Sequence, residues 1–277
     1  MRSILMMITV LAMSPYALAQ HRHDGGAPGA GANATSWTTV PRLLPAGGGR
    51  GEVRLALAGI DAPELVIYAP GGAPETRVRH VPVEAGRARI SPAAPMTGNY
   101  HWVQGREVRP GMVHVASTAV YFSNPGPAPT DLLAETRSEL EIVPTPLPRE
   151  HSRYREGERW PFLVRWQGQA LAAQKLVLET ANGSRTEALS DADGRAVFVF
   201  PLDFDPAQRP GGHDRTSAPF VLWTEHRSDG VHYLSSFTSQ YSPAPERTRS
   251  LAWGAGFGLF GMALAVPLLF RREHRHD

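Results

Sequence analysis

The 277-residue chain has no cysteine, and only one of its 28 basic residues is a lysine, Lys175. Without cysteine there are no disulfide bonds and no thiolate ligands, so any metal site must use histidine, carboxylate, methionine or backbone groups. The other basic residues are arginines that alternate with Glu and Asp, and the formal net charge is only +2. Because nucleic acid binding needs a basic patch or stripe, we expect no nucleic acid partner.

The chain also lacks the short motifs of common enzymes. It has no nucleophile elbow, phosphate-binding loop, dinucleotide fingerprint or H-E-x-x-H zinc motif. Neighbouring carboxylates occur only in predicted turns, as at Asp191 and Asp193, and no bidentate Glu follows them at calcium-loop spacing. We therefore predict that the protein is not an enzyme.

Long amphipathic helices and internal repeats of fixed period are absent, and the remaining pattern is that of β-strands. Short apolar segments about ten residues apart, divided by Pro, Gly and Asn or Asp turn residues, predict an antiparallel sandwich. The clearest such segments are residues 140–143, 160–166, 175–180 and 196–200. The sequence thus predicts an all-β fold of two immunoglobulin-like β-sandwich modules, residues 37–138 and 139–241, followed by one C-terminal transmembrane helix.

The first 19 residues have the pattern of a secretory signal peptide. Arg2 supplies the positive charge, residues 4–12 are apolar, and Ala17-Leu18-Ala19 is an A-x-A cleavage site. The apolar run is too short for an ordinary membrane span. Cleavage after Ala19 would place the mature chain outside the cytoplasm.

The other end predicts a membrane anchor. Residues 251–270 form an uncharged apolar run that just spans a bilayer core at ~1.5 Å per residue. Arg271 and Arg272 follow at once, which favours a cytoplasmic tail, residues 271–277. Residues 242–250 form a proline-containing stalk before the span. The predicted location is the cell membrane, with a single pass and periplasmic domains.

Two glycines of this span, Gly254 and Gly258, have the G-x-x-x-G spacing of a helix dimerisation motif. They indicate either homodimerisation through the helix or a weakly packed anchor.

The predicted mature N-terminus carries a candidate metal site. Gln20 would begin a flexible arm, residues 20–36, and His21 in second place would chelate with the terminal amine and the intervening amide. Cleavage one residue later would make His23 third, giving a square-planar set of one amine, two amides and one imidazole that suits Cu(II) or Ni(II). The alternative is a hydrophilic linker whose histidines bind nothing.

A second candidate metal pair is His226 and His232, which flank a predicted hairpin turn at residues 228–230. A three-residue loop would pair the two histidines directly, with Cβ atoms ~5 Å apart. A two-residue turn at Asp229-Gly230 would instead place them on opposite faces. The alternative interpretation is an exposed polar hairpin. Two further histidines, at positions 101 and 114, fall on adjacent predicted strands and are interpreted as satisfied, half-buried side chains.

The second module resembles a known family. The segments LEIVP, FLVRWQGQAL and SDADGRA, at residues 140–144, 162–171 and 190–196, resemble the C-terminal part of the DUF4198 family. That family includes periplasmic accessory proteins of nickel and cobalt importers. The resemblance, over roughly residues 139–240, implies an immunoglobulin-like module, a nickel or cobalt ion as cargo, and a metal transporter subunit as partner; the donor set of the N-terminal arm adds copper to these ions.

The sequence therefore predicts an exported, membrane-anchored accessory protein for transition-metal uptake. The alternative is a non-metal immunoglobulin-like module that scaffolds a complex of the cell envelope.

Overall fold

The structure, a computed structural model, describes residues 37–49, 51–92, 98–122, 126, 128–149, 153–205, 216–244 and 262. The predicted signal peptide, histidine arm and transmembrane helix lie outside these residues, apart from Met262. No helix of this described part is both long and apolar enough to cross a membrane. Strands dominate it, which confirms the all-β class.

The first seven strands form two antiparallel sheets, in the orders β1-β2-β5 and β4-β3-β6-β7. Their bounds are β1 Arg42–Gly49, β2 Glu52–Ala58, β3 Glu64–Tyr68, β4 Val78–Pro82, β5 Arg87–Ile90, β6 Tyr100–Arg109 and β7 Met112–Tyr121; the 3-10 helix η2 is Pro74–Thr76. In the usual immunoglobulin lettering, β1, β2 and β5 correspond to strands A, B and E, and β4, β3, β6 and β7 correspond to C′, C, F and G. The two sheets are therefore the ABE and C′CFG sheets of an immunoglobulin-like sandwich. Strand β1 was not predicted, because its proline and three glycines have low strand propensity.

The later strands repeat this order. They form the sheets β8-β10-β14, with short β11 beside β10, and β13-β12-β15-β16, with short β9 beside β16. Their bounds are β8 Leu140–Pro144, β9 Tyr154–Arg155, β10 Arg159–Trp166, β11 Gln169–Ala170, β12 Lys175–Thr180, β13 Arg185–Leu189, β14 Arg195–Val199, β15 Ala218–Ser228 and β16 Val231–Ser242. All four predicted strands between residues 140 and 200 are present. Strand β13 was missed because its charged, mostly exposed residues lack an apolar pattern.

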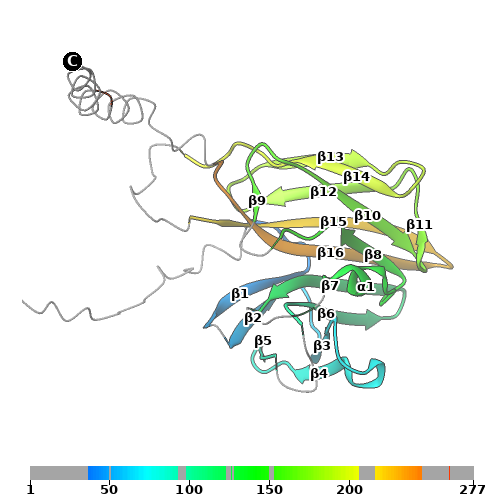
Figure 1. The fold of residues 1–277 in the computed structure, drawn as a ribbon. Helices are drawn as coiled ribbons and strands as arrows, with labels where there is room; N and C mark the ends of the chain where they lie inside the picture. Colours follow the sequence, from blue (N-terminus) through cyan, green and yellow to red (C-terminus); the bar gives the residue numbers. More distant parts are fainter. Residues whose placement is uncertain are drawn as a thin grey trace, which may run out of the picture. The chain divides into compact units, whose positions relative to one another are not determined.

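The last strands of the two sandwiches pair with each other. Strand β16 runs parallel to β7 and joins the two C′CFG sheets into one continuous sheet, visible along the middle of Figure 1. The Ser117 hydroxyl donates to the Ser236 carbonyl at 2.8 Å, and the Thr118 hydroxyl donates to the Thr238 carbonyl at 2.8 Å. We call this β7–β16 pairing the seam. It holds the two sandwiches in one sheet.

The two hydrophobic cores lie on opposite faces of this shared sheet. Trp102 and Val103 are neighbours on β6 and therefore point to opposite faces. Trp102 stacks on Phe237 and belongs to the core of the second sandwich, whereas Val103 belongs to the core of the first. A third, smaller cluster packs Val40, before β1, against Val221 and Leu234 of the second sandwich. Side chains of each sandwich thus help to bury those of the other.

The linker between the sandwiches is fixed by ion pairs to both. It contains the short helix α1, Thr130–Ala134, and continues into β8. Two of its carboxylates bind the first sandwich: Glu135 with Arg77 at 3.0 Å and Glu139 with Arg106 at 2.6 Å. Glu141, at the start of β8, binds Arg165 of β10 at 2.9 Å and is only 4% exposed. The linker therefore constrains the sandwiches in addition to the seam.

Candidate functional site

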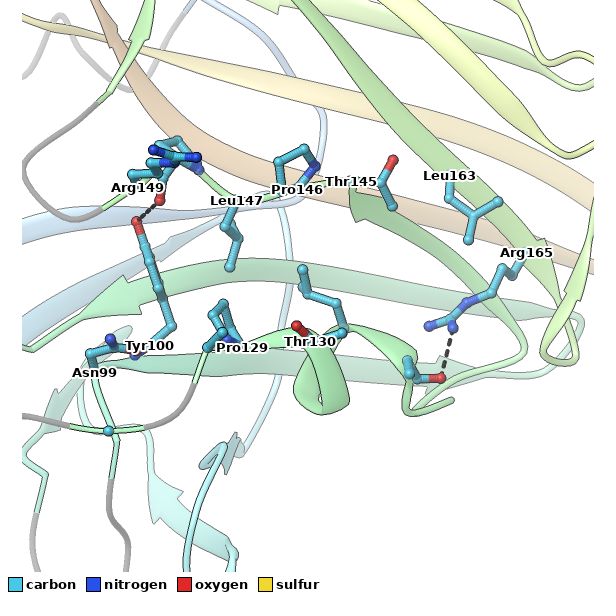
Figure 2. A pocket seen from close by; sticks show the side chains of 15 residues that line it. Asn99, Tyr100, Pro129, Thr130, Thr145, Pro146, Leu147, Arg149, Leu163 and Arg165 are labelled. Carbon is cyan, nitrogen blue, oxygen red and sulfur yellow. Dashed lines mark hydrogen bonds between the residues drawn. The ribbon is translucent and has the colours of Figure 1, made fainter.

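The most apolar of the clefts described lies beside the linker, between the two sandwiches (Figure 2). Its volume is about 890 Å³. It is bounded by the start of β6, helix α1, the loop after β8, and β10. The lining residues are Asn99, Tyr100, Gly126, Ala128, Pro129, Thr130, Leu133, Ala134, Thr145, Pro146, Leu147, Pro148, Arg149, Leu163 and Arg165.

Prolines shape one wall of this cleft. Pro146 and Pro148 lack backbone N–H groups, so the chain after β8 cannot continue as a paired strand. The loop crosses instead toward β6, where the Tyr100 hydroxyl donates to the Pro148 carbonyl at 2.9 Å. Leu147, between the two prolines, is buried and lines the cleft. The result is an apolar wall formed largely by proline and leucine.

Arginines lie at two places around the cleft, as Figure 2 shows. The Arg165 guanidinium donates to the Ala134 carbonyl at 3.0 Å and to the Glu135 carbonyl at 2.8 Å, and it pairs with Glu141. Its charge is therefore neutralised. Arg149 is exposed and makes no ion pair with the residues that the structure describes. The rim thus offers one available positive charge beside an apolar interior.

The described lining of the cleft is suited to binding an apolar group. None of the lining residues in the described part of the chain is a carboxylate, a histidine or a cysteine. Hydroxyl groups are present at Tyr100, Thr130 and Thr145; that of Tyr100 donates to the Pro148 carbonyl, and the described lining holds no carboxylate or histidine beside the two threonines to activate them. Sequence reasoning missed this cleft, because its residues come from four separate segments and the proline run was the only local signal.

The candidate metal residues divide into two groups. Gln20, His21 and His23 lie outside the described residues. His226 and His232 do not form the predicted direct pair, because the hairpin turn has two residues rather than three: Ser228 pairs with Val231, and His232 pairs with Arg227. Asp229 and Gly230 both have positive φ, 53° and 76°, as a tight two-residue turn requires. The two histidines therefore point to opposite faces of the sheet, as the second register predicted.

Each of these histidines has a different environment. His226 packs against Trp166, with ring centroids 4.5 Å apart. On the other face, His232 lies 6.3 Å from His114 between ring centroids, and its Nε2 atom is 3.4 Å from a Glu225 carboxylate oxygen. In these side-chain positions no three His, Asp or Glu residues of the described segments converge to surround an ion. Burial is the main cause that lowers the pKa of His114.

The interpretation of His101 as half-buried is wrong. Its side chain is completely buried, in edge-on contact with Phe122, and neither ring nitrogen makes a well-formed hydrogen bond within the described segments. Burial, with a smaller effect of the nearby Arg79 charge, lowers its pKa to about 4. Although His101 and His114 lie on adjacent strands, they are not opposite each other: His101 pairs with Val120, and His114 pairs with Glu107.

Comparison with known proteins gives a low-level structural likeness only. No protein-family model matches the sequence, and no curated protein matches it. Similar solved structures include a segment of a 1.5-MDa bacterial ice-binding adhesin (13% identity, TM-score 0.24, covering 69% of this chain and 57% of that one). A segment of two fibronectin type III domains from chicken tenascin is also similar, with 9% identity and a TM-score of 0.21, and the match covers 72% of this chain and 97% of that one. The D0-D1 domain of intimin has 11% identity and a TM-score of 0.23, and the match covers 73% of this chain and 96% of that one.

The chain thus spans little more than half the length of the adhesin structure. TM-scores this low support no conclusion about function. The two sandwiches are called immunoglobulin-like because of the order of their strands.

Proposed function

We propose that this chain is an exported, membrane-anchored immunoglobulin-like module that holds a partner protein in an envelope complex. The observation that supports it best is an apolar cleft between two sandwiches that share one continuous sheet. A partner bound there would contact β6 of the first sandwich, β10 of the second and the linker together. Because the seam and the ion pairs of the linker fix these elements, such a partner would meet a preformed surface.

The occupant best suited to the cleft is an apolar segment of a partner with an acidic residue at one end. The prolines and leucines would accommodate the apolar part, and Arg149 at the rim would pair with the acid. The predicted C-terminal span supports a location at the membrane surface, with both sandwiches on the periplasmic side.

A photo-crosslinking experiment in native membranes tests this function. A benzophenone amino acid at Thr130, inside the cleft, is expected to give one discrete adduct, which Leu133→Asp should abolish. The matched control position is Val108, which is 64% exposed and is not a lining residue of the cleft. Equal adducts at both positions, or none at Thr130, would contradict partner binding in the cleft.

The second candidate function is metal capture for a nickel, cobalt or copper transporter. Its support is the sequence of the arm, in which Gln20, His21 and His23 supply an amine, amides and imidazoles. Metal would bind to neutral imidazole and a deprotonated amine, so affinity would fall below the ordinary histidine pKa of ~6.5. Pairing through Gly254 and Gly258 would place two such arms on one dimer.

Intact mass spectrometry distinguishes the two functions. The mature chain is purified from membranes, and its mass is recorded with and without Ni(II) or Cu(II). A chain that begins at Gln20 or His21 and retains one metal ion, lost in the His21→Ala/His23→Ala variant, would support metal capture. A chain that retains no metal would leave the interaction module as the function.

A further inference from the structure

Two histidines from the two sandwiches meet across the seam. In the parallel pairing of β7 with β16, His232 lies opposite Met112, and Leu234 lies opposite His114. His114 therefore lies two residues along β7 from the residue opposite His232, so the two histidine side chains are on the same face of the sheet in neighbouring positions. Their ring centroids are 6.3 Å apart and their planes are 82° apart. Two imidazoles that bind one tetrahedral ion at Zn–N distances of ~2.1 Å have centroids roughly 5.3 Å apart, so these two rings would have to approach each other by about 1 Å to share an ion.

A carboxylate of the second sandwich lies beside this pair. The Glu225 oxygen is 3.4 Å from His232 Nε2, and that nitrogen has no hydrogen-bond partner among the described residues. The Glu225 side chain is 48% exposed, and His232 is its only ion-pair partner in the described part of the chain. Its carboxylate can therefore rotate toward both rings at little cost, since no other ion pair has to break.

The other nearby carboxylate already has partners. Glu107 lies opposite His114 on β6, but one of its oxygens accepts a hydrogen bond from the Asp61 backbone at 3.0 Å. The other oxygen pairs with Arg109. Glu107 is thus held in place as a neighbour of the site, and Glu225 is the carboxylate available as a ligand.

We propose that His114, His232 and Glu225 form a site for a divalent transition-metal ion, such as Zn²⁺, that bridges the two sandwiches across the seam. Two imidazoles and one carboxylate are a common set of protein ligands for zinc, with water in the fourth position. Binding requires the two rings and the carboxylate to close around the ion by side-chain rotation, because they do not surround one in their present positions. The site is separate from the N-terminal arm and does not depend on either proposed function.

The consequence would be an ion that links the sandwiches at one end of the seam. His114 follows the β6–β7 turn and His232 follows the β15–β16 turn, where the His232 backbone N–H donates to the Gly111 carbonyl at 2.9 Å. An ion bound by both strands would restrain these turns together. Because it binds only the folded chain, it would also raise the melting temperature.

The test is Zn²⁺ titration calorimetry on the full chain carrying His21→Ala and His23→Ala, so that the arm contributes nothing. We expect one Zn²⁺ per chain, and a loss of affinity in His114→Ala or His232→Ala of more than the ~10–100-fold that follows when only a partner that orients a metal ligand is removed. Glu225→Gln, which keeps the shape of the side chain, should weaken binding in the same direction. The matched control is His226→Ala, on the opposite face of the same hairpin, which should leave the affinity unchanged.

Thermal melts separate loss of the site from loss of the fold. Each variant is melted without metal and with saturating Zn²⁺, and the rise in melting temperature caused by Zn²⁺ should disappear only in the variants of the three ligands. No Zn²⁺ binding by the parent chain would overturn the proposal. An affinity that is unchanged in His114→Ala, or is lost equally in His226→Ala, would overturn it as well.

Discussion

The completely buried His101 predicts a specific loss of stability in acid. Burial lowers its pKa to about 4, and the nearby Arg79 charge adds to the shift. In the unfolded chain the imidazole would titrate near its ordinary pKa of ~6.5. As the pH falls below 6.5, the unfolded chain binds a proton that the folded chain still excludes, so the free energy of unfolding decreases.

The magnitude follows from the difference between the two pKa values. Each pKa unit corresponds to about 1.36 kcal/mol. The exclusion of a proton from His101 should therefore lower the free energy of unfolding by ~2 kcal/mol when the pH falls from 7.5 to 5, and by ~3 kcal/mol in total once the pH is below 4. The loss begins near pH 6.5 and is complete near pH 4. This is a large part of the ~5–15 kcal/mol that stabilises a typical protein.

The assay is urea unfolding at pH 7.5 and pH 5, comparing the parent with His101→Leu. Leucine cannot titrate and has no polar ring atoms to bury in the core, so the variant should be about as stable as the parent at pH 7.5. Between pH 7.5 and 5 it should lose ~2 kcal/mol less than the parent, because the other titrating groups are common to both. Equal losses in parent and variant would refute the reasoning.

Three further predictions concern polar and aromatic contacts that stabilise the sandwiches and the linker. Glu141→Ala would leave Arg165 buried without its carboxylate and should cost ~3–5 kcal/mol of unfolding free energy, measured by urea titration. Trp102→Ala removes the ring that stacks on Phe237 across the two sandwiches and should cost ~3–5 kcal/mol in the same assay. Asp203→Ala removes the carboxylate that accepts hydrogen bonds from Tyr241 and Thr180, and should cost ~1–3 kcal/mol, visible as a lower melting temperature.

An exposed ion pair provides the common control for these variants. Arg54→Ala breaks only the exposed contact with Glu52 and should change the free energy of unfolding by less than ~1 kcal/mol. A comparable loss in the control, or losses below ~1 kcal/mol in Glu141→Ala and Trp102→Ala, would show that the linker and the shared core contribute less than their burial indicates.

Local patterns in the sequence predicted the strands well where the residues alternate and turns divide them. The expected turn residues between the strands at 160–166 and 175–180 include Gln167 and Gly168, and both have positive φ, 49° and 79°. The turn that begins at Asp191 was also predicted, and its carboxylate accepts hydrogen bonds from the backbone of Asp193 and Arg195. Such features depend on residues close together in the chain, so local sequence contains the information.

Pairing between strands that are far apart in the chain could not be predicted from local sequence patterns. The parallel seam between β7 and β16 joins strands more than a hundred residues apart, and nothing in either strand specifies the other as its neighbour. The same limit applies to the candidate sites. His232 was singled out from the sequence as a candidate metal ligand, but the histidine beside it is His114 across the seam, not His226 across the hairpin.

The sequence by itself determined the all-β class, most of the strands and the absence of thiolate chemistry, because these follow from composition and from contacts between near neighbours. Only the tertiary structure decided that the two sandwiches share one sheet, that their cores lie on opposite faces, and that a cleft forms beside the linker. A one-residue difference in the length of one turn determined which face His232 occupies. That difference depends on backbone geometry at Asp229 and Gly230, where the sequence left both turn lengths open and the structure shows the two-residue turn that an Asp-Gly pair favours.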